Sequence, residues 1–159
     1  MNNSINNIYH LVNNPFLLVE YIIEFYDNYE NIDNDFLLSY FILPITMYEP
    51  SRMQLQYPKK DLGKFIIKDG KENKTIIIGL EKRFEQYKEL TNIALQIGFT
   101  NKKLKLNDNL TIELINKKKQ SKEITQNFSN ELKCAKNLGK LFSKYEIQDI
   151  YKFFKVREI

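Results

Sequence analysis

The side chains on which hydrolytic and transfer enzymes most depend are scarce in this sequence of 159 residues. The single histidine, His10, lies in a polar stretch whose pattern predicts no fixed packing, so we expect neither a histidine-based triad nor a zinc site there. The single cysteine, Cys134, falls on the apolar side of a predicted helix, which favours a small core residue over a nucleophile. One cysteine also excludes an internal disulfide, as is typical of proteins in a reducing cytoplasm.

Motifs that bind phosphate or metal are also missing from the sequence. The five glycines are scattered and none precedes a Lys-Ser or Lys-Thr pair, so there is no Gly-rich phosphate loop. Asp33-Asn34-Asp35 begins like a calcium loop but lacks its glycine and its distal glutamate, and a helix cap is the better interpretation. We therefore expect a protein that is not an enzyme and that uses no metal ion and no cofactor.

Lysines are abundant in the second half of the chain, where they could contact the phosphates of a nucleic acid. Arginine, which bidentate reading of bases favours, occurs only three times, so any DNA contact should be weak, directed at the backbone and sensitive to salt. Solvated helix faces are the alternative explanation of the same lysines. The candidate nucleic-acid contacts are Lys102, Lys103, Lys117, Lys118 and Lys119.

Charge is divided unevenly along the chain. The first fifty residues carry a net charge of −7 with no lysine or arginine, whereas residues 51–100 carry +4 and residues 101–159 carry +7. Two differently charged faces would suit a connector between partners, although an acidic half can also simply neutralise a basic half within one fold. The N-terminus lacks a signal peptide and no apolar run reaches the ~18 residues of a membrane span, so we expect a cytoplasmic protein with no membrane contact.

The apolar pattern predicts a single compact α-rich domain with one β-hairpin, an α+β fold that is partly winged-helix-like. Residues 1–13 are expected to be a flexible N-terminus and residues 14–159 the domain. Asn14-Pro15 should start a largely apolar central helix that ends near Asn28, because Asn caps free N–H groups and Pro suits the first helical position. An alternation of period two predicts the hairpin near 102–115, with its turn at residues 107–109.

Helical spacing predicts the remaining elements. Leu43-Pro44 should interrupt the second helix, because proline cannot donate the backbone bond. Gly98 is placed to end a helix over residues 89–98. The other predicted helices are residues 45–56, 61–69, 75–87, 121–144 and 147–154.

Three stretches of the sequence resemble the middle component of three-component ABC ATPase systems, prokaryotic conflict operons to which the Lamassu defence systems are related. The first begins at Asn14-Pro15-Phe16 and ends at Tyr29. The second is the run from Leu43-Pro44 to Arg52, and the third is residues 135–142, closing on residues 153–157. Residues 79–84 are more loosely similar to the central helix of that family. Leu141 stands where the family often has a tryptophan.

The resemblance implies a non-enzymatic adaptor that links an SMC-like ABC ATPase subunit to an effector subunit, commonly a nuclease, in an anti-phage or anti-plasmid defence complex. The alternative function is that of a winged-helix-like DNA-binding regulator. We expect Arg52 to hydrogen-bond carbonyls or an acid of the first helix, and Gly139 to permit close approach of another backbone. The candidate structural motif comprises Pro15, Leu43, Pro44, Arg52, Gly139 and Arg157.

Overall fold

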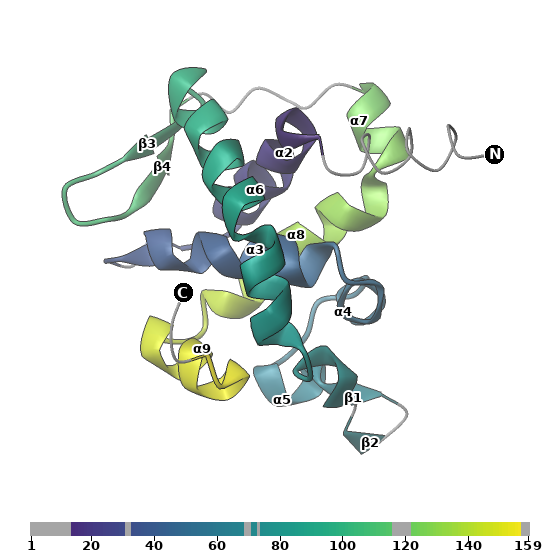
Figure 1. The fold of residues 1–159 in the computed structure, drawn as a ribbon. Coiled ribbons are helices and arrows are strands. Elements are labelled where there is room, and N and C mark those ends of the chain that lie inside the picture. The colour runs from purple at the N-terminus through teal and green to yellow at the C-terminus, as the bar shows by residue number, and fades with distance from the viewer. Residues whose placement is uncertain (1–13, 31–32, 69–70, 73, 116–121, 157–159) are drawn as a thin grey trace.

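Helix α2, Pro15–Tyr26, packs against three other helices of the computed structural model, which describes residues 14–30, 33–68, 71–72, 74–115 and 122–156 (Figure 1). The Asn14 side chain accepts a hydrogen bond from the Phe16 N–H at 3.0 Å, and Pro15 occupies the first turn, as predicted. Most of the helix is buried, although Phe16 is 65% exposed. The helix is therefore the central one that its apolar pattern predicts.

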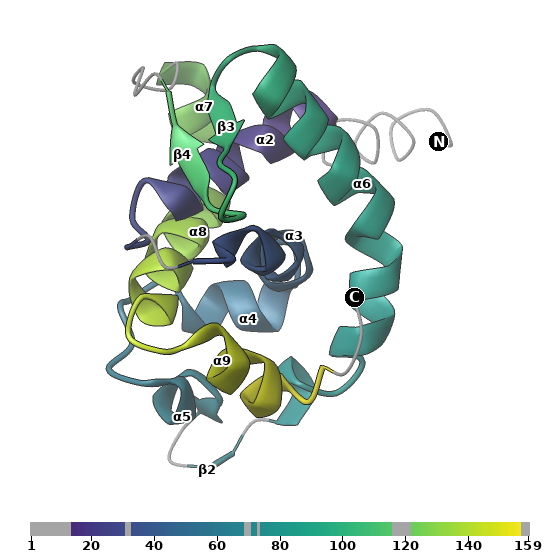
Figure 2. The ribbon, with the colours of Figure 1, turned by 90° about the vertical axis from the view of Figure 1, so that its left-hand side faces the viewer.

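Helix α6, Leu80–Thr100, runs along one side of the molecule (Figure 2) and replaces the two shorter helices that the sequence predicts there. Gly98 does not end a helix but lies inside this one, and it is buried. A Cβ atom at Gly98 would lie 2.6 Å from Leu104 Cδ1 and 3.1 Å from Val19 Cγ2. The glycine thus lets the hairpin and α2 pack closely on α6, which is a tertiary role and not a capping one. Residues 75–79, predicted as helix, form the end of a 3₁₀ turn and a tight turn before α6.

The segment around Pro44 also differs from the prediction. After the 3₁₀ helix η1, Asp35–Leu38, helix α3 runs over Ser39–Thr46 with Pro44 inside it. The chain breaks later, at Met47 and Tyr48, before α4, Glu49–Gln54. Leu43 and Ile45 on both sides of the proline are fully buried, so their packing outweighs the one backbone bond that proline removes.

The C-terminal part of the described chain contains three helices. The single helix predicted over 121–144 is two, α7, Lys122–Asn127, and α8, Ser129–Phe142, because Phe128 leaves the helical conformation at φ −124° and ψ 29°. Helix α9, Ile147–Phe154, has the bounds that its apolar spacing predicts. At the centre of the molecule, Phe41 of α3 makes ring contacts with Phe142 of α8 and Phe154 of α9.

The predicted hairpin is present as strands β3, Leu104–Leu106, and β4, Ile112–Leu114, paired antiparallel with Leu104 opposite Leu114. The predicted helix over 61–69 is instead the short α5, Leu62–Phe65, followed by a second small antiparallel pair, β1, Ile67–Lys68, and β2, Lys71–Glu72. The fold is thus α-rich with an antiparallel hairpin, as predicted. None of the described helices is both long and apolar enough to cross a membrane.

Candidate interaction site

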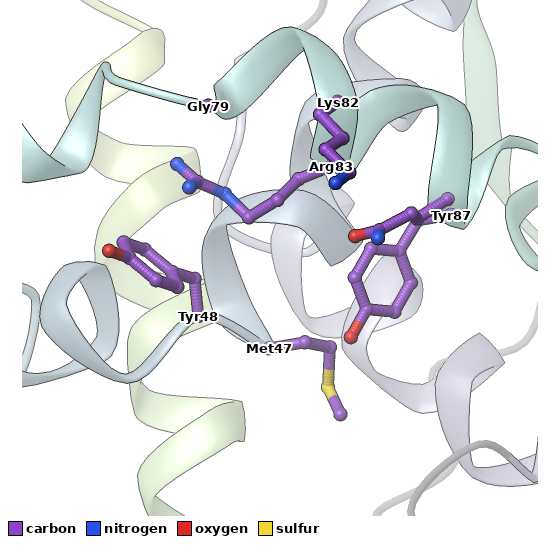
Figure 3. Close-up of a pocket in the computed structure, with 7 residues that line it drawn as sticks. Met47, Tyr48, Gly79, Lys82, Arg83 and Tyr87 are labelled. Carbon is purple, nitrogen blue, oxygen red and sulfur yellow. The ribbon is translucent and has the colours of Figure 1, made fainter.

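A polar pocket lies where the loop after α3 meets the first turns of α6 (Figure 3). Its volume is about 430 Å³. The Arg83 side chain extends from α6 over the ring of Tyr48. Met47 and Tyr87 lie on the other side of Arg83 (Figure 3). The lining residues are Met47, Tyr48, Gly79, Lys82, Arg83, Gln86 and Tyr87.

The guanidinium of Arg83 is held in place from three directions. Its Cζ lies 3.8 Å from the centroid of the Tyr48 ring, a cation–π contact. Its two terminal nitrogens donate hydrogen bonds to the carbonyl oxygens of Ile78 at 3.1 Å and of Ile76 at 2.6 Å. Partial burial lowers the pKa of Arg83 from its ordinary value, but a guanidinium keeps its charge in proteins. The pocket therefore contains a fixed cation.

The turn before α6 explains why this arrangement forms. Ile76 is fully buried and anchors the 3₁₀ helix η2, Lys74–Ile76, while Ile78 is 67% exposed two residues later. Gly79 then adopts a positive φ of 72°, a conformation that a side chain would strain, and α6 begins immediately after it. The turn directs the carbonyls of Ile76 and Ile78 toward Arg83. No side chain caps the start of α6.

The pocket has the chemistry of an anion site. Two cations, Lys82 and Arg83, line it, and no acidic residue does. The Nε–H of Arg83 is buried and has no hydrogen-bond partner in the described structure. Sequence reasoning missed this site, because Tyr48 and Arg83 are far apart in the chain and no local pattern relates them.

A second pocket, of about 650 Å³, lies between the segment before η1 and the start of α9, and its charge is opposite. It contains three acidic residues and no lysine or arginine. Asp149 is also 3.7 Å from the Lys152 ammonium, and Asp33 accepts a hydrogen bond from the Asn109 amide at 2.7 Å. The lining residues are Asp33, Asn34, Leu37, Glu146, Ile147, Gln148 and Asp149.

In the segment Asp33-Asn34-Asp35, Asn34 occupies the N-cap position of η1. The side chain of Asn34 makes no capping bond. Asp35 is fully buried, and its Oδ1 accepts a hydrogen bond from the Ile112 N–H at 2.8 Å, which ties η1 to strand β4. Burial raises the pKa of Asp35 to about 6. Nowhere in the described ranges do three or more His, Cys, Asp or Glu residues gather as metal ligands would.

Arg52 contacts both a carbonyl and an acid, but neither group belongs to the first helix. Its Nη1 lies 3.4 Å from the Thr46 carbonyl of α3 and 3.2 Å from a Glu131 carboxylate oxygen of α8. The prediction of an acid in the first helix is therefore wrong, and Arg52 instead connects α4 to α3 and α8.

Cys134, three residues after Glu131 in α8, is completely buried, and burial raises the pKa of its thiol. Cys134 is therefore a core residue.

Of the other motif residues, Gly139 has the clearest role. A Cβ there would lie 2.5 Å from the Phe25 carbonyl oxygen, so α8 and the end of α2 are in backbone contact. Leu43 and Pro44 are buried in α3, and Pro15 starts α2. The pocket at Arg83 and the contact at Gly139 each join two of the stretches on which the family resemblance rests. Arg157 and His10 lie outside the described residues.

The structure describes two of the five lysines predicted as candidate nucleic-acid contacts, Lys102 and Lys103. Lys102 is exposed at the start of the hairpin, with a positive φ of 51°. The Lys103 ammonium instead forms an ion pair with the buried carboxylate of Glu20 in α2, and is not a free phosphate contact. This pair joins the acidic and basic parts of the chain within the fold. The remaining candidates, Lys117, Lys118 and Lys119, lie outside the described residues.

Comparison with known proteins found a match to one protein family. The sequence model of a family described as ABC-three component (ABC-3C) system Middle Component 3 matches residues 2–158, nearly the whole chain. No curated protein matched the chain, and no solved structure matched it.

Proposed function

This chain belongs to the Middle Component 3 family of ABC-three component systems, and from that premise we propose that it is the adaptor subunit that joins the other two components. A middle component has partner components by definition of the system. We propose that these are an SMC-like ATPase and an effector, and that the chain holds both at once without catalysing a reaction itself.

The observation that carries the proposal is the position of the two pockets. The acidic pocket includes Asp33 and Leu37, at the beginning of the segment formed by η1 and α3, whereas the cationic pocket includes Met47 and Tyr48, directly after its end. Two concave sites of opposite charge at opposite ends of the segment formed by η1 and α3 can receive two partners of different charge at the same time. A protein that binds a single partner needs only one such site.

The residue inventory supports the non-catalytic part of the proposal. The thiol of Cys134 is buried with a raised pKa and is not a nucleophile. The acid of the described chain with the most perturbed environment, Asp35, is bonded to the backbone of strand β4 and lies in neither pocket. Its pKa is raised by burial in the fold, and the bond from the Ile112 N–H opposes that rise.

On the resemblance of residues 14–29, 43–52 and 135–142, the last closing on residues 153–157, we further propose that the complex works in the cytoplasm as an anti-phage or anti-plasmid defence system related to Lamassu, with a nuclease as effector. The proposal predicts that cells carrying the three genes plate phage or retain plasmids less efficiently than cells in which the middle gene is deleted. Equal phage and plasmid counts with and without the gene would argue against defence while leaving the adaptor role open.

Complex formation tests the adaptor role itself. The purified chain, mixed with the ATPase component or with the effector component, should co-elute with each in size-exclusion chromatography. Glu146→Lys in the acidic pocket should weaken binding of one partner and leave the other bound, because it reverses the charge of one pocket only. Co-elution with neither partner at physiological salt would refute the adaptor function.

A further inference from the structure

We propose that the pocket between Tyr48 and Arg83 receives an aspartate or glutamate side chain of a partner component, carried by a segment with an apolar residue beside the acid. The inference rests on the adaptor function and deepens it, because it specifies the chemistry that one of the two pockets recognises. The features that carry it are the charge of the lining, the fixed geometry of Arg83 and the apolar surface around the pocket.

The charge of the lining favours an anion. Lys82 and Arg83 face the pocket without an acidic residue among the lining side chains, which are otherwise neutral. Both cations are carried by the first turns of α6. A carboxylate in the pocket would therefore be attracted by two side chains together.

The geometry of Arg83 favours a planar anion that is bound in one orientation. The Tyr48 ring and the carbonyls of Ile76 and Ile78 hold the guanidinium fixed, so little side-chain entropy is lost on binding. A guanidinium has five N–H groups, and the carbonyls of Ile78 and Ile76 each accept one, from different terminal nitrogens, so one N–H remains on each terminal nitrogen. A carboxylate can accept from two such groups at once.

The surroundings favour a protein side chain over a free phosphate. Met47 and Tyr87 contribute apolar surface to the pocket lining. Ile78, which precedes the lining residue Gly79, is 67% exposed. Two backbone carbonyls already face the guanidinium, which offsets part of its charge and suits a singly charged carboxylate better than a doubly charged phosphate. An acid next to an apolar residue would use both the cationic pocket and the exposed isoleucine.

The test places a competing carboxylate in the pocket. Gln86→Glu adds an acid to the lining near Arg83 without removing any contact of the guanidinium, so the fold should be retained. Gln96→Glu is the matched control, because Gln96 is also an exposed glutamine of α6 but does not line the pocket. Isothermal titration of each purified partner component should show roughly tenfold or greater loss of affinity for one partner with Gln86→Glu, and a change of less than about twofold with Gln96→Glu.

The outcomes separate this inference from the adaptor function. If both variants bind both partners as the unchanged chain does, the pocket is not the site and the inference is wrong, while the adaptor function stands. If the unchanged chain binds neither partner, both fail. Water-soluble carbodiimide, which joins an amine to a carboxylate as an amide, should cross-link Lys82 to an Asp or Glu of the affected partner. Loss of binding in Gln86→Glu without that cross-link would overturn the assignment of a carboxylate and point to a phosphate-bearing ligand.

Discussion

The close packing of α8 against α2 depends on the absence of a side chain at Gly139. Gly139→Ala would place a Cβ 2.5 Å from the Phe25 carbonyl oxygen, and because that atom is backbone, one helix must move. We expect the free energy of unfolding to fall by roughly 1–3 kcal/mol, as for other overpacked sites, despite the better helix propensity of alanine. Urea unfolding followed by circular dichroism measures the change.

The control for this variant is Gly63→Ala in α5, where the glycine is exposed and the added Cβ would meet only the Asp61 side chain, at 3.2 Å. It should change stability by about 1 kcal/mol or less. Equal effects of the two substitutions would contradict the role assigned to Gly139.

Asp35 is the residue whose ionisation should make stability depend on pH. It is fully buried, its Oδ2 has no hydrogen-bond partner, and burial raises its pKa from the ordinary 3.8 to about 6. Between these two values the folded chain binds more protons than the unfolded chain, so this group's contribution to stability falls as the pH rises from about 4 to about 6. Above about pH 6 the contribution is constant and unfavourable.

The isosteric variant Asp35→Asn removes the titration while keeping an acceptor for the Ile112 N–H. The stability of the original chain relative to this variant should decline by roughly 2 kcal/mol between pH 4 and pH 7, because each unit of pKa shift corresponds to about 1.4 kcal/mol and part of it is screened. Urea unfolding of both proteins over that range measures the difference. A difference that does not change with pH would show that the carboxyl is not perturbed.

At the scale of elements, the Arg52–Glu131 pair is what joins α4 to α8 through side-chain charge. Both side chains are mostly buried, at 24% and 19% exposed, so Arg52→Met leaves a carboxylate without its partner in a poorly hydrated position. We expect this variant to lose roughly 1–3 kcal/mol of stability, and the double variant Arg52→Met with Glu131→Gln to recover part of that loss.

Lys152→Ala provides the comparison, because its pair with Asp149 is exposed on both sides, and removing such a pair usually changes stability by less than about 0.5 kcal/mol. Thermal unfolding of the unchanged chain, Arg52→Met, Glu131→Gln, the double variant and Lys152→Ala measures these differences and completes the double-mutant cycle. If Arg52→Met is as stable as Lys152→Ala, the connection between α4 and α8 is not electrostatic.

The elements that local chemistry determines were predictable, and those that tertiary contacts determine were not. Asn14-Pro15 at the start of α2 and the period-two pattern of the hairpin are read from neighbouring residues, and both predictions are confirmed. Gly98 fits a helix end by local rules, but the contacts with Leu104 and Val19 require a small residue inside a longer helix. Pro44 fits a helix break, but the buried flanks hold α3 together through it.

The same distinction applies to the candidate site. The mid-helix position of Gly139 predicts close approach of another backbone, because a glycine there is costly without one. The pocket at Arg83 depends on a contact with Tyr48 across a long stretch of chain, and the positive φ of Gly79 that allows it has no unique sequence signal. The expected acid partner of Arg52 was wrong for the same reason, since the sequence does not show which helix lies opposite.

In the whole molecule, the net charge of a stretch of sequence does not predict the charge of the pocket to which that stretch contributes residues. The first fifty residues have a net charge of −7, yet they supply Met47 and Tyr48 to the cationic pocket. The basic last part of the chain supplies Glu146 and Asp149 to the acidic pocket. The pair between Glu20 and Lys103 neutralises one acid of the first part within the fold. The two pockets of opposite charge are therefore a product of folding.

A three-protein capture experiment tests whether this chain bridges two other components. The effector component is immobilised, the ATPase component is added in solution, and capture of the ATPase is measured with and without this chain at physiological salt. If the chain is the bridge, the ATPase is retained only when the chain is present, and Gln86→Glu or Glu146→Lys each reduces retention while Gln96→Glu does not. Retention of the ATPase to the same extent without the chain would show that the chain is not the bridge.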